Sequence, residues 1–225
     1  MFSNALKEKL GAGEAFVGMM SNGTSGDINI WDFSGRIKFP EGELAKSRKI
    51  GGELAEKVLE RIQALKWEQS PALKCSFSLL KTERRMPNSG ELEKAKAILA
   101  TGGLEELKPD TEGWQKLYAR EQLMLKEFPE EATCPIQVLH IGKGKIGALP
   151  GEFFAETGLK IKAGLDFPYF TISLANDNVG YVPPSHEIEK GGYETWRCRI
   201  SNLSTDSEEL FRKKLLELIH EGKNF

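Results

Sequence analysis

The chain has 225 residues, a formal net charge of −2 and 40% hydrophobic residues. This length suits one domain, or one and a half, and the absence of any block of like charge excludes a nucleic-acid-binding tail. No apolar run approaches the roughly 20 residues that cross a membrane, and residues 1–10 lack the apolar segment of a signal peptide. We therefore expect a cytoplasmic protein without a transmembrane segment. Three widely spaced cysteines form no metal-binding pair and predict free thiols.

Local patterns predict helices and strands in alternation. The expected helices cover residues 1–10, 41–65, 89–100, about 111–128, 153–163 and 207–220. The expected strands cover residues 14–20, 74–80, 136–141, 145–149 and 170–175, with residues 27–33 extended. Helical spacing of apolar residues indicates the helix at residues 41–65, and period-two alternation indicates the strand at residues 74–80. The predicted fold class is α/β, a mixed β-sheet flanked by helices, in a single domain over residues 1–225.

A glycine-rich segment, Gly142-Lys-Gly-Lys-Ile-Gly147, matches the GxGxxG pattern of dinucleotide-binding loops. That pattern binds a pyrophosphate only when a helix follows it, because the helix N-terminus faces the phosphates. Here a predicted strand follows. The segment therefore predicts a hairpin turn between two strands.

Candidate metal ligands are few. The three histidines are His140, His186 and His220, and no HExxH pattern exists. Among them only His186 has a positional argument for ligation, because it lies near Tyr181 in the sequence. Glu152 follows an apolar strand and a Pro-Gly turn, and its neighbours are apolar. It is either an acid at the start of the next helix or a functional carboxylate.

Four short motifs together resemble the neutral/alkaline non-lysosomal ceramidase family. They are Gly26-Asp-Ile-Asn-Ile-Trp31, Pro150-Gly-Glu-Phe153, Tyr181-Val-Pro-Pro184 and Tyr193-Glu194. The resemblance covers about residues 16–196. It implies a ceramidase-like catalytic domain that hydrolyses an N-acyl amide with zinc, and a small-molecule or lipid-like amide as the substrate.

The resemblance also implies site residues. Glu152 and Tyr181 occupy the positions of zinc ligands, and Tyr193 and Asp27 occupy catalytic positions. The turn that contains Gly23, Thr24, Ser25, Gly26 and Asn29 occupies the substrate-binding position. Asn29 stands where the family has its serine nucleophile, and an amide cannot act as a hydroxyl nucleophile. The turn is either an anion-binding loop or an ordinary connection between strands.

In the family, two histidine ligands precede the Gly-Asp motif, and no histidine precedes Gly26 here. The sequence thus offers two of four zinc ligands, and we expect a truncated or a divergent short member whose isolated chain binds zinc weakly or not at all. Two functions stay open. The chain is either the later part of a zinc amidohydrolase or a non-catalytic binding or assembly module that keeps the scaffold.

Overall fold

The computed structural model describes residues 1–62, 64–102 and 111–221. The chain divides into two compact units. The N-terminal unit comprises residues 1–21 and 29–71, and the sheet unit comprises residues 22–28 and 72–225. The expectation of a single domain over the whole chain stays a prediction. Within the described residues, no helix is both long and apolar enough to cross a membrane.

The N-terminal unit contains two helices, α1 (Phe2–Leu10) and α2 (Ala45–Ile62). They pack so closely that a Cβ added to Gly51 would lie only 2.9 Å from the backbone nitrogen of Phe2. Both helices were expected from the sequence, although α2 is shorter than the predicted 41–65. Residue 63 lies outside the described residues.

Two predicted segments near the N-terminus are wrong. Residues 14–20 form no strand, and residues 27–33 form turns and bends instead of an extended segment. A short apolar run makes a strand only when a neighbouring strand accepts its backbone hydrogen bonds. Here the backbone N–H of Gly18 donates to the side-chain hydroxyl of Ser3 at 3.2 Å, and Met19 is 86% exposed.

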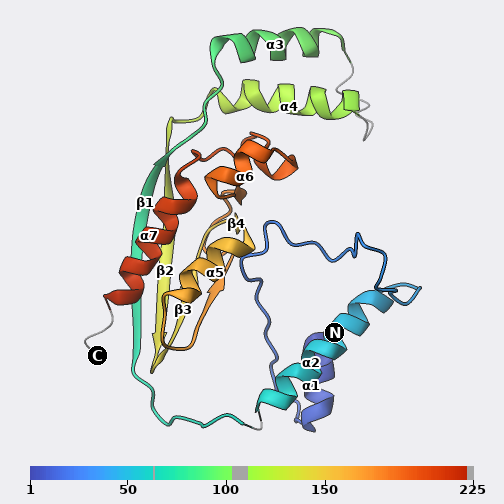
Figure 1. Cartoon of the computed structure of the whole chain (residues 1–225), viewed down its shortest axis with the longest axis vertical. Helices are drawn as coiled ribbons and strands as arrows, with labels where there is room; N and C mark the ends of the chain where they lie inside the picture. Colours follow the sequence, from blue (N-terminus) through green and yellow to red (C-terminus); the bar gives the residue numbers. More distant parts are fainter. Residues whose placement is uncertain (63, 103–110, 222–225) are drawn as a thin grey trace. The chain divides into compact units, whose positions relative to one another are not determined.

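The sheet unit is built on a mixed four-stranded sheet with the strand order β1-β2-β3-β5 (Figure 1). Its strands are β1 (Leu73–Glu83), β2 (Glu131–Ile141), β3 (Gly144–Ala148) and β5 (Tyr169–Ile172). The first three are antiparallel neighbours, and β5 runs parallel to β3. A separate two-stranded parallel ladder is formed by β4 (Glu152–Phe153) and β6 (Tyr181–Val182). The predicted mixed α/β class is therefore confirmed.

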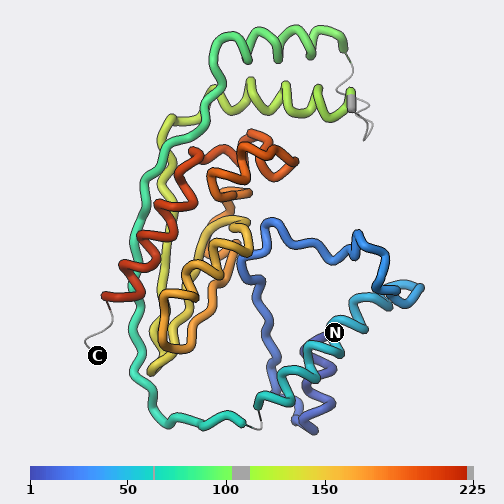
Figure 2. Tube along the Cα trace, in the orientation of Figure 1, coloured from blue at the N-terminus to red at the C-terminus, as the bar shows by residue number. Residues whose placement is uncertain are grey.

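Helices complete the sheet unit. They are α3 (Ser89–Ala100), α4 (Thr111–Leu125), α5 (Ala155–Ala163), α6 (Ser185–Lys190) and α7 (Ser207–His220), with a short 3-10 helix, η1 (Tyr193–Thr195). The α3 and α4 helices pack on each other between β1 and β2 in the chain, as the trace in Figure 2 shows. The predicted helices at residues 89–100 and 207–220 are confirmed at both ends. Residues 103–110, which precede α4, lie outside the described residues.

One face of the sheet carries the core. The α5 and α7 helices pack on this face, where alternate residues of β2 such as Ile136 and Val138 are fully buried in one cluster with Phe211. Each large apolar side chain buried in this way stabilises the fold by about 1.5–3 kcal/mol. The other face exposes apolar side chains. These are Leu73, Phe77, Leu79, Leu139, Ile141 and Phe170.

The glycine-rich segment forms the predicted hairpin. Gly142 lies in the turn between β2 and β3 with a φ of 53°, a conformation that glycine adopts without strain. The next strand, β3, continues the sheet where a dinucleotide loop would need a helix. The three cysteines are free, as expected, and burial raises the pKa of the Cys134 thiol to about 11.

His140 is buried on the core face of β2, where its Nε2 lies 3.2 Å from the hydroxyl of Ser76. Its Nδ1 has no hydrogen-bond partner among the described residues. Burial lowers the pKa of His140, and the positive charges of Lys145 and Lys74 lower it further, whereas Glu221 opposes them. The folded protein therefore prefers the neutral imidazole.

This preference predicts a pH dependence of stability. Below its ordinary pKa of about 6.5, His140 takes up a proton in the unfolded chain before it does so in the folded one. The free energy of unfolding should thus fall as the pH drops from about 6.5 towards the lowered pKa, and this loss should be absent above about 6.5. Urea unfolding at about pH 8 and about pH 5.5 measures the loss, which His140→Gln should reduce. An equal loss in His140→Gln would assign it to other groups.

Candidate active site

The β4–β6 ladder places Glu152 directly opposite Tyr181. The backbone N–H of Glu152 donates to the carbonyl of Gly180 at 2.8 Å, and the backbone N–H of Val179 donates to the carbonyl of Pro150 at 2.8 Å. Residues opposite each other in a ladder point to the same face, so the carboxylate and the phenol are neighbours. The two residues that the resemblance marks as zinc ligands therefore lie side by side, in a ladder separate from the main sheet.

Two glycines allow this ladder to form. A Cβ on Gly151 would lie 2.8 Å from the carbonyl oxygen of Gly180. Gly180 itself has a φ of 69°, and a Cβ added to it would lie 1.8 Å from the carbonyl oxygen of Ile200. No side chain fits at either position without moving the backbone. The glycines at the two turns thus fix the approach of β4 and β6.

Tyr193 completes the cluster from η1. Its ring meets the ring of Tyr181 edge to face, with centroids 5.6 Å apart and an interplanar angle of 87°. The side chains of Tyr193 and Glu152 both act on the Tyr181 phenol. Burial, the Tyr193 side chain and the negative charge of Glu152 together raise the pKa of Tyr181. At neutral pH the Tyr181 phenol is therefore protonated, while Tyr193 is 53% exposed.

The predicted substrate-binding turn lies beside β4. The backbone N–H of Gly26 donates to the carbonyl of Phe153 at 2.8 Å, and Ser173 donates to Asn22 at 3.1 Å. A Cβ on Gly26 would lie 2.4 Å from the carbonyl oxygen of Glu152, so glycine permits this approach. The turn and Glu152 thus meet, as expected. Binding of a substrate by this turn stays a prediction.

Three residues of this turn make further contacts within the sheet unit. The Asp27 carboxylate accepts a 2.7 Å hydrogen bond from the backbone N–H of Ala155, at the start of α5. Because α5 has no cap from its own N-cap side chain, Asp27 supplies this contact from a distant part of the chain. Thr24 packs against Gly158, and Ser25 accepts from the backbone N–H of Ile28. A catalytic role of Asp27 stays a prediction.

Asn29 belongs to the N-terminal unit, and its side-chain oxygen accepts from the backbone N–H of Trp31 at 3.1 Å. This contact is an ordinary local turn. The substrate-binding role that the resemblance assigns to Asn29 stays a prediction, as does that of Gly23, which lies near the carbonyl oxygen of Thr171 in the sheet unit.

His186 contacts two acids that sequence reasoning missed. Its Nε2 lies 3.0 Å from the carboxylate of Glu156 and 3.2 Å from that of Glu187. One ligand atom from each of the three residues lies within 4.8 Å of the others. Lys160 and Lys190 pair with the two carboxylates, which balances their charge. Glu187 follows His186 directly, but no motif joins Glu156 to them, so only the fold shows the whole cluster.

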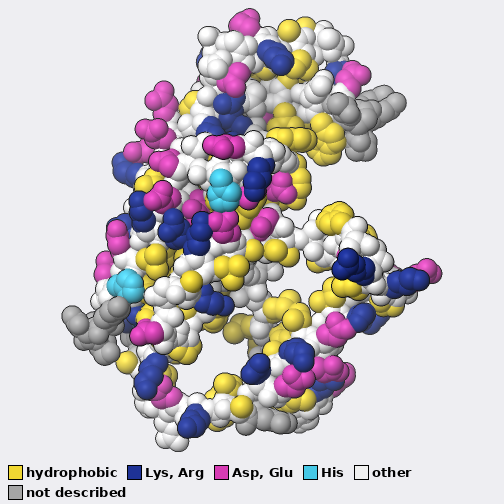
Figure 3. Space-filling view, in the orientation of Figure 1, with side chains coloured by type: hydrophobic (Ala, Val, Ile, Leu, Met, Phe, Trp, Pro, Cys, Tyr) yellow, Lys and Arg dark blue, Asp and Glu magenta, His cyan; other side chains and the backbone are white. Residues whose placement is uncertain are grey.

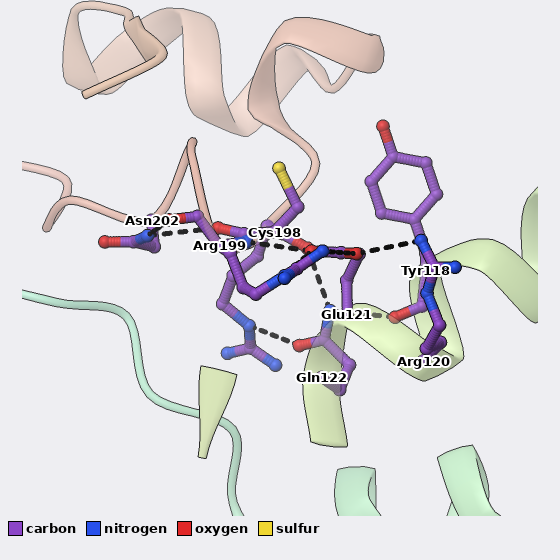
Figure 4. A network of polar contacts seen from close by, with 8 residues as sticks. Tyr118, Arg120, Glu121, Gln122, Cys198, Arg199 and Asn202 are labelled. Carbon is purple, nitrogen blue, oxygen red and sulfur yellow. Dashed lines mark hydrogen bonds and ion pairs between the residues drawn. The ribbon is translucent and has the colours of Figure 1, made fainter. Parts of the chain in front are cut away.

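A polar network anchors the segment that follows η1 to α4 (Figure 4). The carboxylate of Glu121, which is 8% exposed, accepts from Nε and Nη2 of Arg199 at 2.9 and 3.0 Å. This bidentate pair lowers the pKa of Glu121. Next to it, Gln122 accepts from Nε of Arg197 at 2.6 Å. The network holds the chain on the C-terminal side of Tyr193, and nothing in the sequence pattern predicted it.

No protein-family profile and no curated protein matches this sequence. Among solved structures, the neutral ceramidase from Pseudomonas aeruginosa matches with a TM-score of 0.61 and 19% identity, over 96% of this chain and 39% of that chain. A structure of a ceramidase complexed with C2 matches with a TM-score of 0.52 and 17% identity, over 80% of this chain and 35% of that one. The chain has a ceramidase-like fold. It spans about two fifths of the length of these ceramidases, and at such identities the likeness concerns the fold alone.

Proposed function

We propose that the chain contributes the Glu152–Tyr181–Tyr193 cluster to a zinc-dependent hydrolase that acts on an N-acyl amide. The observation that carries this proposal is the β4–β6 ladder, which sets the carboxylate opposite the phenol. The ceramidase-like fold supports it, because a neutral ceramidase is among the matching structures. A lipid-like amide is the proposed substrate class.

The donor set of this cluster fits zinc only in part. Zinc sites in proteins use three or four ligands from histidine, cysteine and carboxylate side chains. Glu152 and Tyr181 supply two oxygens, and the raised pKa of Tyr181 keeps its phenol neutral until a cation approaches. His186, the candidate third ligand, instead contacts Glu156 and Glu187. The cluster therefore fits half of a zinc shell, and the remaining ligands must come from outside it.

A bound zinc would polarise the amide carbonyl or lower the pKa of a water molecule. The residues of this chain would bind and position the substrate and the metal. Tyr193, whose side chain is half exposed beside Tyr181, can donate a hydrogen bond to the carbonyl oxygen of the substrate. The β4–β6 ladder holds Glu152 and Tyr181 opposite each other. Asn29 provides no nucleophile.

The test is hydrolysis of a panel of N-acyl amides, with acyl chains of several lengths, by the natural polypeptide that contains these residues. With zinc supplied, we expect activity that Tyr193→Phe lowers by about a hundredfold, the usual loss of one oxyanion donor. Asn29→Ala should lower the activity far less than the loss of a true nucleophile would, since an amide side chain is no nucleophile. Absence of hydrolysis across the whole panel would leave the second function.

That second function is a non-catalytic binding or assembly module. The observation that favours it is the apolar face of the main sheet, where Leu73, Phe77 and Leu79 are more than half exposed. Contiguous apolar surface of this kind marks interaction sites. Light scattering together with the hydrolysis assay distinguishes the two functions. An assembly module should self-associate or bind a partner in the scattering measurement and should show no turnover in the assay.

A further inference from the structure

A cavity of about 940 Å³ lies beside the α3–α4 hairpin, and its described lining includes none of the side chains assigned to the proposed hydrolase. Three aromatic rings line it: Trp114 and Tyr118 from α4, and Trp196 from the segment after η1. Tyr118 and Trp196 meet edge to face with centroids 5.0 Å apart. In the space-filling view, hydrophobic side chains gather along the side of α4 that faces this segment (Figure 3). The volume falls in the range of small-molecule sites.

The charged residues around this cavity are mostly positive. Among the described residues that line it, Arg85, Lys94 and Arg197 are cations and Glu91 is the one acid. Glu91 already pairs with Arg197 at 2.9 Å. The lining therefore carries an excess of two positive charges.

Two of these cations are fixed and half-buried. Arg85 donates to the carbonyls of Leu203, Thr195 and Ser201, which holds its guanidinium in one place. Burial lowers the pKa of Arg85, and the nearby charge of Arg197 lowers it further. A guanidinium has five N–H donors, so Arg85 keeps donors to offer. An anion in the cavity would relieve the repulsion between the two arginines.

The third cation is exposed. Lys94 makes no hydrogen bond or ion pair with another described residue, and it lies one turn before Ile98 on α3, at the cavity lining. A ligand that fills the cavity must therefore combine an apolar body with a negative group. The aromatic walls suit the body, and Arg85, Arg197 and Lys94 suit a carboxylate.

We propose that this cavity binds an amphiphilic carboxylate, with its apolar body against Trp114, Tyr118 and Trp196 and its carboxylate towards Arg85 and Lys94. The binding needs neither zinc nor turnover, so it does not depend on the proposed hydrolase activity.

Calorimetric titration of the whole chain with octanoate tests the proposal, with octan-1-ol and octyltrimethylammonium as probes of the same chain length. Octanoate should bind at least about fivefold more tightly than either probe, because the lining is cationic. Trp114→Ala should weaken octanoate binding by about tenfold, since an aromatic wall is removed. Trp114 is 46% exposed, so this variant should fold, which circular dichroism checks.

A matched pair of charge reversals separates the cavity from the general charge of α3. Lys94→Glu should weaken octanoate binding by about fivefold, whereas Lys96→Glu, on the same helix but outside the cavity lining, should leave it unchanged. The proposal is overturned if octanoate does not bind, if the uncharged or cationic probe binds as tightly, or if Trp114→Ala has no effect. Equal effects of the two reversals would also overturn it.

Discussion

Replacing Gly180 by alanine is expected to lower the free energy of unfolding by about 3 kcal/mol or more. Two costs combine. A non-glycine residue at a φ of 69° is strained, and the new Cβ would lie 1.8 Å from the carbonyl oxygen of Ile200. That oxygen belongs to the backbone, so the clash can be relieved only by moving β6 and with it Tyr181. Denaturant unfolding of the whole chain measures the loss.

Gly102→Ala is the matched control, because Gly102 has a φ of 83° in the same unit but no described residue lies within 4 Å of its Cβ position. The free energy of unfolding of this variant should fall only by the cost of the left-handed backbone conformation, about 1–2 kcal/mol. If the two variants lose the same amount of stability, the close approach of β6 to Ile200 is not a packing constraint, and Gly180 is not needed to form the ladder.

Glu152→Gln is expected to lower the rate of N-acyl amide hydrolysis at least about a hundredfold in the natural polypeptide with zinc supplied. The change keeps the shape of the side chain and removes its charge, so the β4–β6 ladder and the contact with Tyr181 should survive. The loss would therefore reflect chemistry and not folding. The quantity to compare is kcat/KM for the best amide of the panel.

Glu156→Gln provides the control for this loss. Glu156 is a carboxylate of the same kind on α5, where it contacts His186 and Lys160. It should keep its rate within about threefold, as a surface acid away from the reacting groups does. A rate that falls with Glu156→Gln and survives Glu152→Gln would move the active site to the His186 cluster.

Much of the fold was predictable because local signals and tertiary contacts agree. The helix at Ser207–His220 has its apolar residues on one stripe, and burial of Phe211 and Leu215 makes that stripe the core side. The predicted strand at residues 14–20 was wrong because a short apolar run does not supply a partner strand. The strands β4 and β6 were missed because two residues are too few to show any period.

The candidate site was predictable only in part. The motifs around Glu152 and Tyr181 led to two residues that the structure brings together, although their roles as ligands stay predictions. The pair of Glu121 with Arg199 was out of reach, because the two residues share no motif and meet only once α4 is packed. His186 was singled out from its position in the sequence, but its contact with Glu156 exists only because the fold brings α6 to α5.

Calorimetric titration of the whole chain with zinc tests the proposed ligand pair most directly. Four-ligand structural sites bind zinc with about 10–16 kcal/mol, and half a shell should give about half of that, a dissociation constant of about 1 µM or weaker. We expect weak binding that the double variant Glu152→Gln with Tyr181→Phe abolishes and His186→Ala leaves intact. Binding that His186→Ala abolishes and the double variant leaves unchanged would contradict this assignment, and would place the metal between Glu156 and Glu187.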